Sequence, residues 1–124
     1  MSTILIVEDN EKNMKLARDV LQARGYQTIE AETGEDGVRL ALERKPDLVL
    51  MDIQLPGING VEAFRRIRAE AATAHIPIAA LTASVTPTNR GEITAAGFDA
   101  FLSKPINLKE FLETVQRLTG GGGK

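Results

Sequence analysis

Short runs of consecutive apolar residues recur along the chain and alternate with stretches in which apolar residues return every three or four positions. The runs, rich in β-branched residues, are typical of strands buried on both faces of a sheet, and the longer period is typical of amphipathic helices. The pattern predicts strands over residues 4–7, 27–31, 48–51, 77–81 and 100–103. It predicts helices over residues 11–24, 34–44, 61–69, 87–96 and 108–118.

Residues at the ends of the predicted helices support these boundaries. Gly25 and Gly97 are suited to stop a helix, and Thr33 is suited to cap one. Lys45-Pro46 should end the second helix. The fourth helix carries poor interior residues (Thr88, Asn89, Gly91, Thr94), so we expect that segment to be short or mobile.

Strands that alternate with helices predict an α/β fold with a parallel sheet covered by helices on both faces. Right-handed crossovers leave few possible topologies. A chain of 124 residues fits one domain, which we place at residues 1–119. The Gly-rich residues 120–124 are expected to form a flexible tail.

Composition narrows the class of protein. With 43% hydrophobic residues the chain can build a core, and a net charge of -2 without a basic stripe argues against nucleic-acid binding. The absence of cysteine excludes disulfides and thiolate chemistry. The first apolar run is too short for a membrane span or a signal-peptide core. We therefore expect a cytoplasmic, monomeric protein without membrane contact.

Polar side chains that can carry chemistry follow the predicted strands. Glu8 and Asp9 follow the first strand, Asp52 the third, Thr82 the fourth and Lys104 the fifth. The carboxyl ends of parallel strands meet at one edge of the sheet, where open α/β folds bind their ligands. Each residue alone has an ordinary explanation, such as a cap or a turn. Together they predict a site with three carboxylates, one hydroxyl and one ammonium.

Carboxylates gathered from two strands repel one another unless a cation neutralises them. Oxygen ligands select a hard cation such as Mg²⁺, which keeps room for phosphate oxygens. Asp52 would be a nucleophile toward a phosphoryl group, and Lys104 and Thr82 would hold phosphoryl oxygens. His75 lies before the fourth strand, away from this edge, and is interpreted as a surface residue.

Four stretches of the chain, at matching spacing, resemble the receiver domain of bacterial two-component response regulators, and the resemblance covers residues 3–118. The stretches are Ile4-Leu5-Ile6-Val7-Glu8-Asp9-Asn10, residues 46–57 around Leu50-Met51-Asp52, Leu81-Thr82-Ala83 and Leu102-Ser103-Lys104-Pro105. The resemblance implies a flavodoxin-like five-stranded sheet with strand order 2-1-3-4-5.

The resemblance also implies roles for individual residues. Asp52 is the expected phosphorylation site. Mg²⁺ is expected to be bound by Asp9, Asp52 and the Gln54 carbonyl, with Glu8 acting through a water molecule.

Two further residues are implied to switch conformation on phosphorylation: the hydroxyl of Thr82 and the aromatic ring of Phe101. Phe101 has no hydroxyl, so it would act through packing alone. Lys104 is the lysine of the family's site, and its bond to Pro105 is cis in the family.

The implied function is that of a stand-alone response regulator in a phosphorelay. The motifs look most like single-domain regulators of the cell-fate type and like receivers attached to hybrid kinases. A histidine kinase or phosphotransfer domain would supply the phosphoryl group, and output would follow through a downstream protein partner. We expect no enzymatic activity beyond assistance of the domain's own aspartyl phosphorylation and dephosphorylation.

The predicted first helix is the expected contact for the kinase. Its apolar positions cover more than one stripe, so one flank could be exposed. We expect Asn10, Asn13 and Met14 to form part of the docking face. The alternative is that Met14 packs on the last helix.

Three other functions deserve comparison. A flavin-binding domain of the same fold would need no acid cluster and would want more aromatic residues than the one Tyr and four Phe present. A phosphohydrolase with an aspartate nucleophile usually has a second acid two residues later, where this chain has Gln54. A receiver-like module that binds proteins without phosphate is disfavoured by the intact set of Asp9, Asp52, Thr82 and Lys104.

Overall fold

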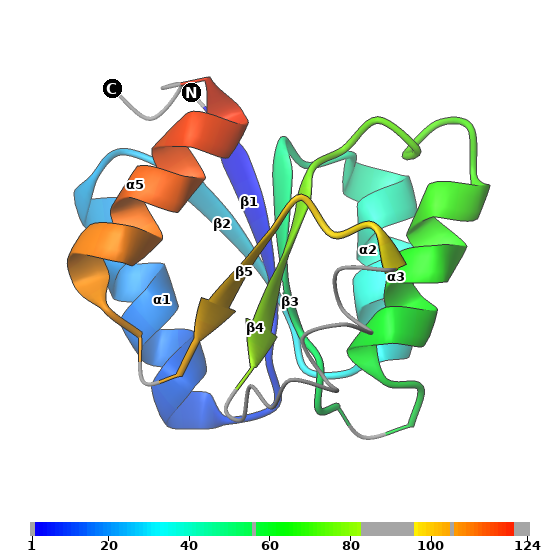
Figure 1. The fold of residues 1–124 in the computed structure, drawn as a ribbon, viewed down its shortest axis with the longest axis horizontal. Coiled ribbons are helices and arrows are strands. Elements are labelled where there is room, and N and C mark those ends of the chain that lie inside the picture. The colour runs from blue at the N-terminus through cyan, green and yellow to red at the C-terminus, as the bar shows by residue number, and fades with distance from the viewer. Residues whose placement is uncertain (1, 56, 83–95, 105, 121–124) are drawn as a thin grey trace.

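Five parallel strands form one sheet in the computed structural model, which describes residues 2–55, 57–82, 96–104 and 106–120 (Figure 1). The strands are β1 (Thr3–Val7), β2 (Gln27–Ala31), β3 (Leu48–Asp52), β4 (Ile78–Thr82) and β5 (Ala100–Ser103). The helices of the described residues are α1 (Glu11–Ala23), α2 (Gly34–Arg44), α3 (Gly60–Ala69) and α5 (Leu108–Thr119). These nine elements confirm their predictions, with each end shifted by one residue at most.

The strand order β2-β1-β3-β4-β5 confirms the predicted topology. β1 lies between β2 and β3 and pairs with both, and β3 is the central strand, with β4 on its other side. All five strands run in the same direction, so their carboxyl ends reach the same edge (Figure 1). At that edge Asp52 is in register with Leu81, and Thr82 with Ser103.

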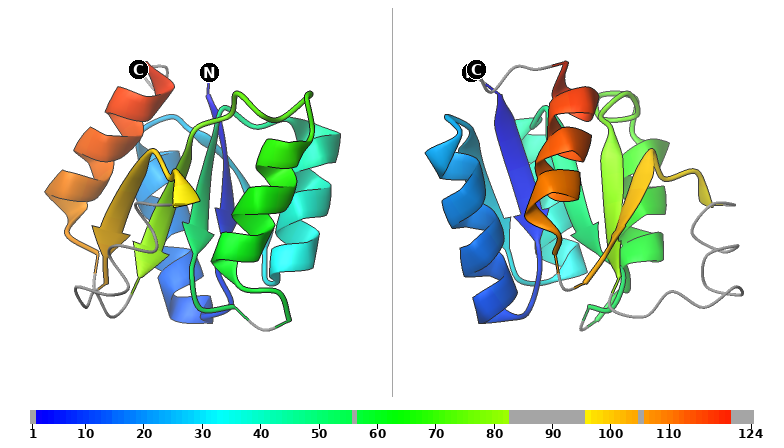
Figure 2. Two further views of the ribbon diagram at one scale, coloured as in Figure 1. Left: turned by 45° about the vertical axis from the view of Figure 1, so that its right-hand side comes forward. Right: turned by 60° about the vertical axis from the view of Figure 1, so that its left-hand side comes forward.

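Helices cover both faces of the sheet, as expected. α1 and α5 lie on one face, and α2 and α3 on the other (Figure 2). Alternate strand residues serve the two faces: Ile4 and Ile6 belong to the apolar cluster beneath α1 and α5, whereas Leu5 and Val7 belong to the one beneath α2 and α3. Because both faces are buried, β1, β3 and β4 are apolar almost without interruption.

The helices begin at short polar side chains that accept a backbone N–H. The predicted cap Thr33 accepts from the Asp36 amide at 3.1 Å. Three asparagines do the same for the other helices: Asn10 for α1, Asn59 for α3 and Asn107 for α5. Gly25, the predicted stop of the first helix, has the positive φ of 90° that such a stop requires.

The expected fourth helix lies outside the described residues except for its last residue, Ala96. Gly97, its predicted stop, has a φ of 100°. The Gly-rich tail also lies outside them, apart from Gly120, which ends α5 with a φ of 69°. Among the described helices, none is long and apolar enough to cross a membrane.

Candidate functional site

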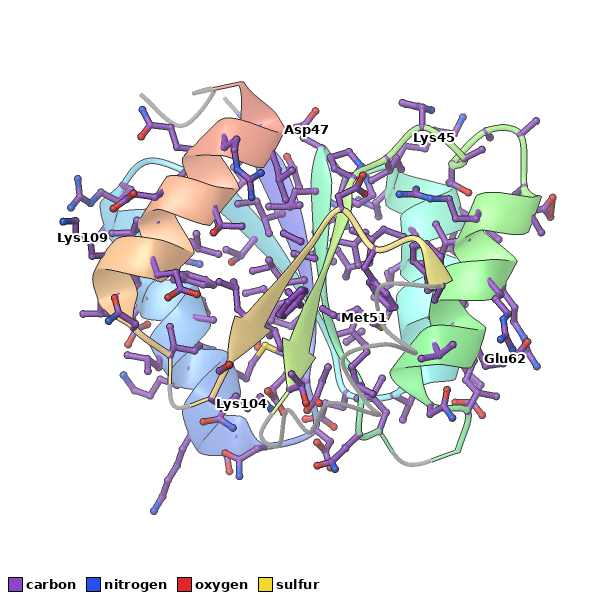
Figure 3. The ribbon with its side chains drawn as sticks, viewed as in Figure 1. Lys45, Asp47, Met51, Glu62, Lys104 and Lys109 are labelled. Carbon is purple, nitrogen blue, oxygen red and sulfur yellow. The ribbon has the colours of Figure 1, made fainter. Side chains whose placement is uncertain are left out.

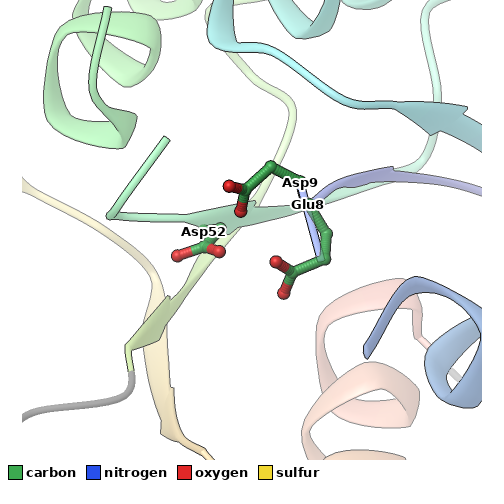
Figure 4. A group of neighbouring side chains, drawn as sticks. All are labelled: Glu8, Asp9 and Asp52. Atoms are coloured by element: carbon green, nitrogen blue, oxygen red, sulfur yellow. The ribbon is translucent and has the colours of Figure 1, made fainter. Parts of the chain in front are cut away.

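Three carboxylates gather at the carboxyl edge of the sheet (Figure 4). Glu8 and Asp9 follow β1, and Asp52 is the last residue of the neighbouring β3. One oxygen from each residue lies within 4.8 Å of the others. Glu8 and Asp52 are only 2% and 3% exposed, whereas Asp9 faces solvent. The strand pairing of β1 with β3 therefore brings together the acids that the sequence separates by more than forty positions.

Lys104 lies between two of these acids and follows β5 (Figure 3). Its Nζ atom is 2.8 Å from Asp52 Oδ2 and 2.5 Å from Glu8 Oε1. The Lys104 backbone N–H donates to the Thr82 carbonyl at 2.8 Å, which extends the β4–β5 pairing past the end of β5. The position of the ammonium is thus set by an adjacent strand and not by local sequence.

The two oxygens of Asp52 have different partners. Oδ2 accepts from Lys104 Nζ, and Oδ1 accepts the backbone N–H of Gln54 at 2.9 Å. A carboxylate that accepts two hydrogen bonds in this way is held in one orientation. The side chain is therefore aimed before any ligand arrives.

Glu8 is less completely paired. Its Oε2 accepts the Asn10 backbone N–H at 3.1 Å. Its Oε1 is buried and close to the Lys104 ammonium, but it accepts no hydrogen bond. Glu8 and Lys104 therefore form an ion pair, and Glu8 Oε1 can still accept a hydrogen bond from another donor.

Burial raises the pKa of Glu8 to about 7 because it disfavours the charged form, and the neighbouring Asp52 adds to the rise. Lys104 and the Asn10 N–H act in the opposite direction on the pKa of Glu8 without cancelling the rise. Burial by itself would lower the pKa of Lys104, but its hydrogen bond to Asp52 and its ion pair with Glu8 outweigh this, so its pKa lies above the ordinary value. One ammonium therefore serves two buried acids and does not fully compensate the cluster.

The donor set fits a hard divalent cation. Three carboxylates offer oxygen ligands within 4.8 Å, and the Glu8 Oε1 atom has unused acceptor capacity. A cation of this class takes carboxylate and carbonyl oxygens and retains water or phosphate as further ligands. The predicted metal ligands Glu8, Asp9 and Asp52 are thus brought together by the fold.

The remaining predicted site residues lie at or near the same edge. Thr82 is 3% exposed at the end of β4, and Phe101 is half-buried in β5, in register with Ala80. Gln54 is exposed, and its backbone N–H contacts Asp52; the role of its carbonyl as a metal ligand stays a prediction. Pro105 lies outside the described residues, and so does the expected cis bond.

The expectation that Met14 belongs to a docking face needs correction. Met14 is 6% exposed and belongs to the apolar cluster that includes Phe111 and Val115 of α5. A side chain in the core offers no surface to a partner. The exposed apolar residue of α1 is Leu16, at 41%, whereas Asn13 is half-buried and Asn10 is exposed as the cap of α1. His75 is exposed, as interpreted from the sequence.

One residue next to the site was missed in the sequence. Gly60 begins α3 and lies directly against the backbone of Asp52. The predicted elements leave it between the strand at 48–51 and the helix at 61–69, with no role assigned. The available signal was that a helix began immediately after Asn59-Gly60, eight residues beyond the acid.

Relatives with curated functions match nearly the whole chain. The polar-differentiation response regulators DivK of Brucella anthropi and Brucella ovis are each 42% identical to it over 118 residues, which cover 95% of this chain and 96% of the relative. The family model of the response regulator receiver domain matches residues 4–116.

Solved structures of the same class superpose closely. The receiver domain of the sensor histidine kinase PA1611 from Pseudomonas aeruginosa PAO1, which has a magnesium ion coordinated in its active-site cleft, is 35% identical with a TM-score of 0.90, covering 96% of this chain and 98% of that one. The Vibrio cholerae chemotaxis protein CheY4 is 28% identical with a TM-score of 0.89, covering 95% and 98%. With its sequence, its sheet order and the acid cluster at its sheet edge in agreement, the chain belongs to the response regulator receiver domain family of two-component signalling.

Proposed function

We propose that Asp52 accepts a phosphoryl group from a phosphohistidine, with Mg²⁺ bound beside it, and that the phosphorylated domain signals by binding another protein. The observation that carries the proposal is the environment of Asp52. Its carboxylate is buried, is fixed by Lys104 and the Gln54 N–H, and lies beside two more acids.

The transfer forms one bond and breaks one. A carboxylate oxygen of Asp52 attacks phosphorus, the bond between phosphorus and the donor's imidazole nitrogen breaks, and that nitrogen keeps the electron pair. No base is needed on this chain, because the attacking carboxylate has no proton that must first be removed. The product is an acyl phosphate on Asp52.

Lys104 would stabilise the charge that develops during transfer. Its Nζ already lies 2.8 Å from Asp52 Oδ2, so an ammonium donor stands beside the reacting group. A positioned donor of this kind in a partly buried site contributes to catalysis without reorganising. Contact with phosphoryl oxygens would replace part of its present pairing with Glu8.

Asp9, Asp52 and the Gln54 carbonyl would hold Mg²⁺, with Glu8 acting through a water molecule. The bound ion would supply positive charge for phosphoryl oxygens. The acids' part is to supply oxygen ligands from two strands, and the unused acceptor capacity of Glu8 Oε1 supports this assignment.

Thr82 and Phe101 would change conformation when Asp52 is phosphorylated and so alter the surface that a partner binds. Thr82 ends β4 beside the acid, and Phe101 lies in the adjacent β5. Attraction of the Thr82 hydroxyl to the phosphoryl group would favour one of two pre-existing conformations. Phosphorylated Thr82→Ala should therefore bind the downstream partner more weakly than phosphorylated wild type, while its phosphorylation rate changes less. Equal affinity of the two phosphorylated proteins in a titration would contradict this role.

The donor would be a histidine kinase or a phosphotransfer domain. Support comes from the relatives, which are response regulators, and from a similar receiver that belongs to a sensor histidine kinase. We expect no turnover of a separate substrate, because the residue two positions after Asp52 is Gln54 and not an acid.

Intact-mass spectrometry after incubation with acetyl phosphate tests the proposal, with Mg²⁺ or with EDTA, for wild type and Asp52→Ala. We expect a gain of one phosphoryl group that depends on Mg²⁺ and is absent in Asp52→Ala. A parallel incubation with a phosphorylated histidine kinase covers a receiver that discriminates among donors. If neither donor gives an adduct, the alternative of a phosphate-independent binding module replaces the proposal.

A further inference from the structure

We infer that Gly60 is a positioning residue for Asp52: because it lacks a side chain, the first turn of α3 packs on the Asp52–Ile53 backbone and aims the carboxylate. The inference deepens the proposed function, since it concerns the acid assigned there as phosphoacceptor. It rests on the close approach between the start of α3 and the end of β3.

The space at Gly60 is closed by backbone atoms. A Cβ atom at this position would lie 2.3 Å from the Asp52 carbonyl oxygen and 2.8 Å from Ile53 Cα. Both distances are below van der Waals contact, and neither atom can rotate away as a side chain could. Gly60 does not have a positive φ among the described residues, so the requirement for glycine is one of space and not of backbone conformation.

Hydrogen bonds hold this backbone on two sides. The Gly60 N–H donates to the Ile53 carbonyl at 3.0 Å, and the Ile53 N–H donates to the Leu81 carbonyl of β4 at 3.0 Å. Ile53 is thus fixed between α3 and the sheet. A side chain at Gly60 must displace either the start of α3 or the residues that carry the acid.

A shift of the Ile53 backbone would also move the Gln54 N–H, which is hydrogen-bonded to the Asp52 carboxylate. Asp52 Oδ1 accepts the backbone N–H of Gln54, one residue beyond Ile53. Asp52 Oδ2 remains tied to Lys104, which is anchored to β4 through its own N–H. If the 52–54 backbone shifts, the two bonds to the carboxylate can no longer be made together at their present lengths.

Helix α2 approaches the loop that joins β3 to α3. Gly57 has a φ of 74°, and a Cβ atom there would lie 2.6 Å from an oxygen of Glu35 in α2. A Cβ atom at Gly34 would lie 2.7 Å from the Ile58 carbonyl oxygen. α2 therefore lies close to the loop backbone at Ile58, whereas the exposed Glu35 carboxylate beside Gly57 can rotate away.

The test compares Gly60→Ala with Ile67→Val under matched conditions. Ile67 is fully buried on the same helix but is not among the atoms that a Cβ at Gly60 would meet, so its truncation loosens α3 without touching the acid. Two readouts are taken: the phosphorylation rate constant at saturating Mg²⁺ and acetyl phosphate, and hydrogen exchange of the Gln54 amide by NMR. We expect Gly60→Ala to lose at least about tenfold in rate and in Gln54 amide protection, since small misplacements of reacting groups cost one to two orders of magnitude. Ile67→Val should stay within about twofold of wild type in both.

A second pair of variants, at Asn59, perturbs the start of α3 less and tests the inference if Gly60→Ala does not fold. Asn59→Ala removes the cap at the start of α3, where the Asn59 side chain accepts the Glu62 N–H at 2.9 Å, and Asn59→Ser retains a capping oxygen. We expect Asn59→Ala to slow phosphorylation and expose the Gln54 amide, and Asn59→Ser to restore both.

The outcomes separate the inference from the proposed function. Wild-type rate and amide protection in Gly60→Ala would overturn the inference, as would equal losses in Gly60→Ala and Ile67→Val. If Asn59→Ala leaves both readouts unchanged when Gly60→Ala fails to fold, the inference is also overturned. If wild type itself accepts no phosphoryl group, the proposed function fails, and the exchange of the Gln54 amide still decides whether Gly60 positions Asp52.

Discussion

The metal-free protein should lose stability as the pH rises through the range in which Glu8 ionises. Glu8 is 2% exposed, and its burial beside Asp52 raises its pKa from 4.5 to about 7. Between these two values the folded protein binds a proton that the unfolded chain releases. The contribution is therefore fully present below about pH 4.5 and is lost as the pH rises through about 7.

The difference between the two pKa values sets the size of the effect. One pKa unit corresponds to about 1.4 kcal/mol, so the rise at Glu8 corresponds to on the order of 3 kcal/mol of unfolding free energy. Most of this should be lost between about pH 5 and about pH 8. Such a loss is a large fraction of the stability of a small domain, which is typically about 5–15 kcal/mol.

Urea unfolding followed by far-ultraviolet circular dichroism measures the effect in the presence of EDTA. The variant is Glu8→Gln, which cannot ionise, and the control is Glu43→Gln, an exposed acid of α2 that pairs with Arg39. We expect wild type and Glu43→Gln to lose stability with rising pH, and Glu8→Gln to lose much less. Added Mg²⁺ should stabilise wild type more at about pH 8 than at about pH 5, since a cation favours the ionised acid.

Equal slopes of stability against pH in wild type and Glu8→Gln would refute this reasoning. That result would mean that the folded protein does not hold an extra proton on Glu8 in this pH range. Asp19 acts in the opposite direction: Lys15 lowers its pKa, so its contribution to stability is lost as the pH falls and not as the pH rises.

Three further substitutions have expected outcomes that chemical denaturation can check. Lys104→Met leaves the buried carboxylates of Glu8 and Asp52 without their ammonium and should lower the free energy of unfolding by about 3–5 kcal/mol at about pH 8 without Mg²⁺. Added Mg²⁺ should restore part of this loss. An unchanged denaturation midpoint would contradict the ion pairing. Asp99→Ala removes the acceptor of the Ile78 N–H at 2.8 Å and the partner of Arg68 at 2.7 Å. It should lower the free energy of unfolding by about 1–3 kcal/mol. An unchanged stability would mean that water replaces the carboxylate. Lys45→Gly should instead stabilise the protein by up to about 1 kcal/mol, because Lys45 ends α2 with a φ of 47° that glycine adopts without strain; a lower midpoint would show that the side chain contributes more than its strain costs.

The elements of the fold were predictable from local pattern because their physical causes are local. The all-apolar run Leu48–Met51 marks a strand buried on both faces, and Thr33 marks the start of a helix by the hydrogen bond that its own side chain can accept. The residues of the site were predictable for a related reason: parallel strands place their carboxyl ends at one edge, so Glu8, Asp52 and Lys104 had to meet there.

Surface exposure was harder to predict, because it depends on the rotation of a helix against its neighbours. The spacing of apolar residues in α1 left open whether one flank faces solvent. Packing against α5 and the sheet decided that Met14 lies in the core and Leu16 outside it. Two positions along a helix differ by about 200° of rotation about its axis. A small error in the predicted direction of the apolar face therefore interchanges buried and exposed residues.

The sequence by itself thus determined the order of the elements and the set of chemical groups at the sheet edge. Only the tertiary structure decided how those groups are paired and aimed: which Asp52 oxygen meets Lys104, why burial raises the pKa of Glu8, and why Gly60 must lack a side chain. The physical reason is that composition and periodicity report the local preferences of each segment. Distances between atoms of different segments arise only when the sheet and its helices pack together.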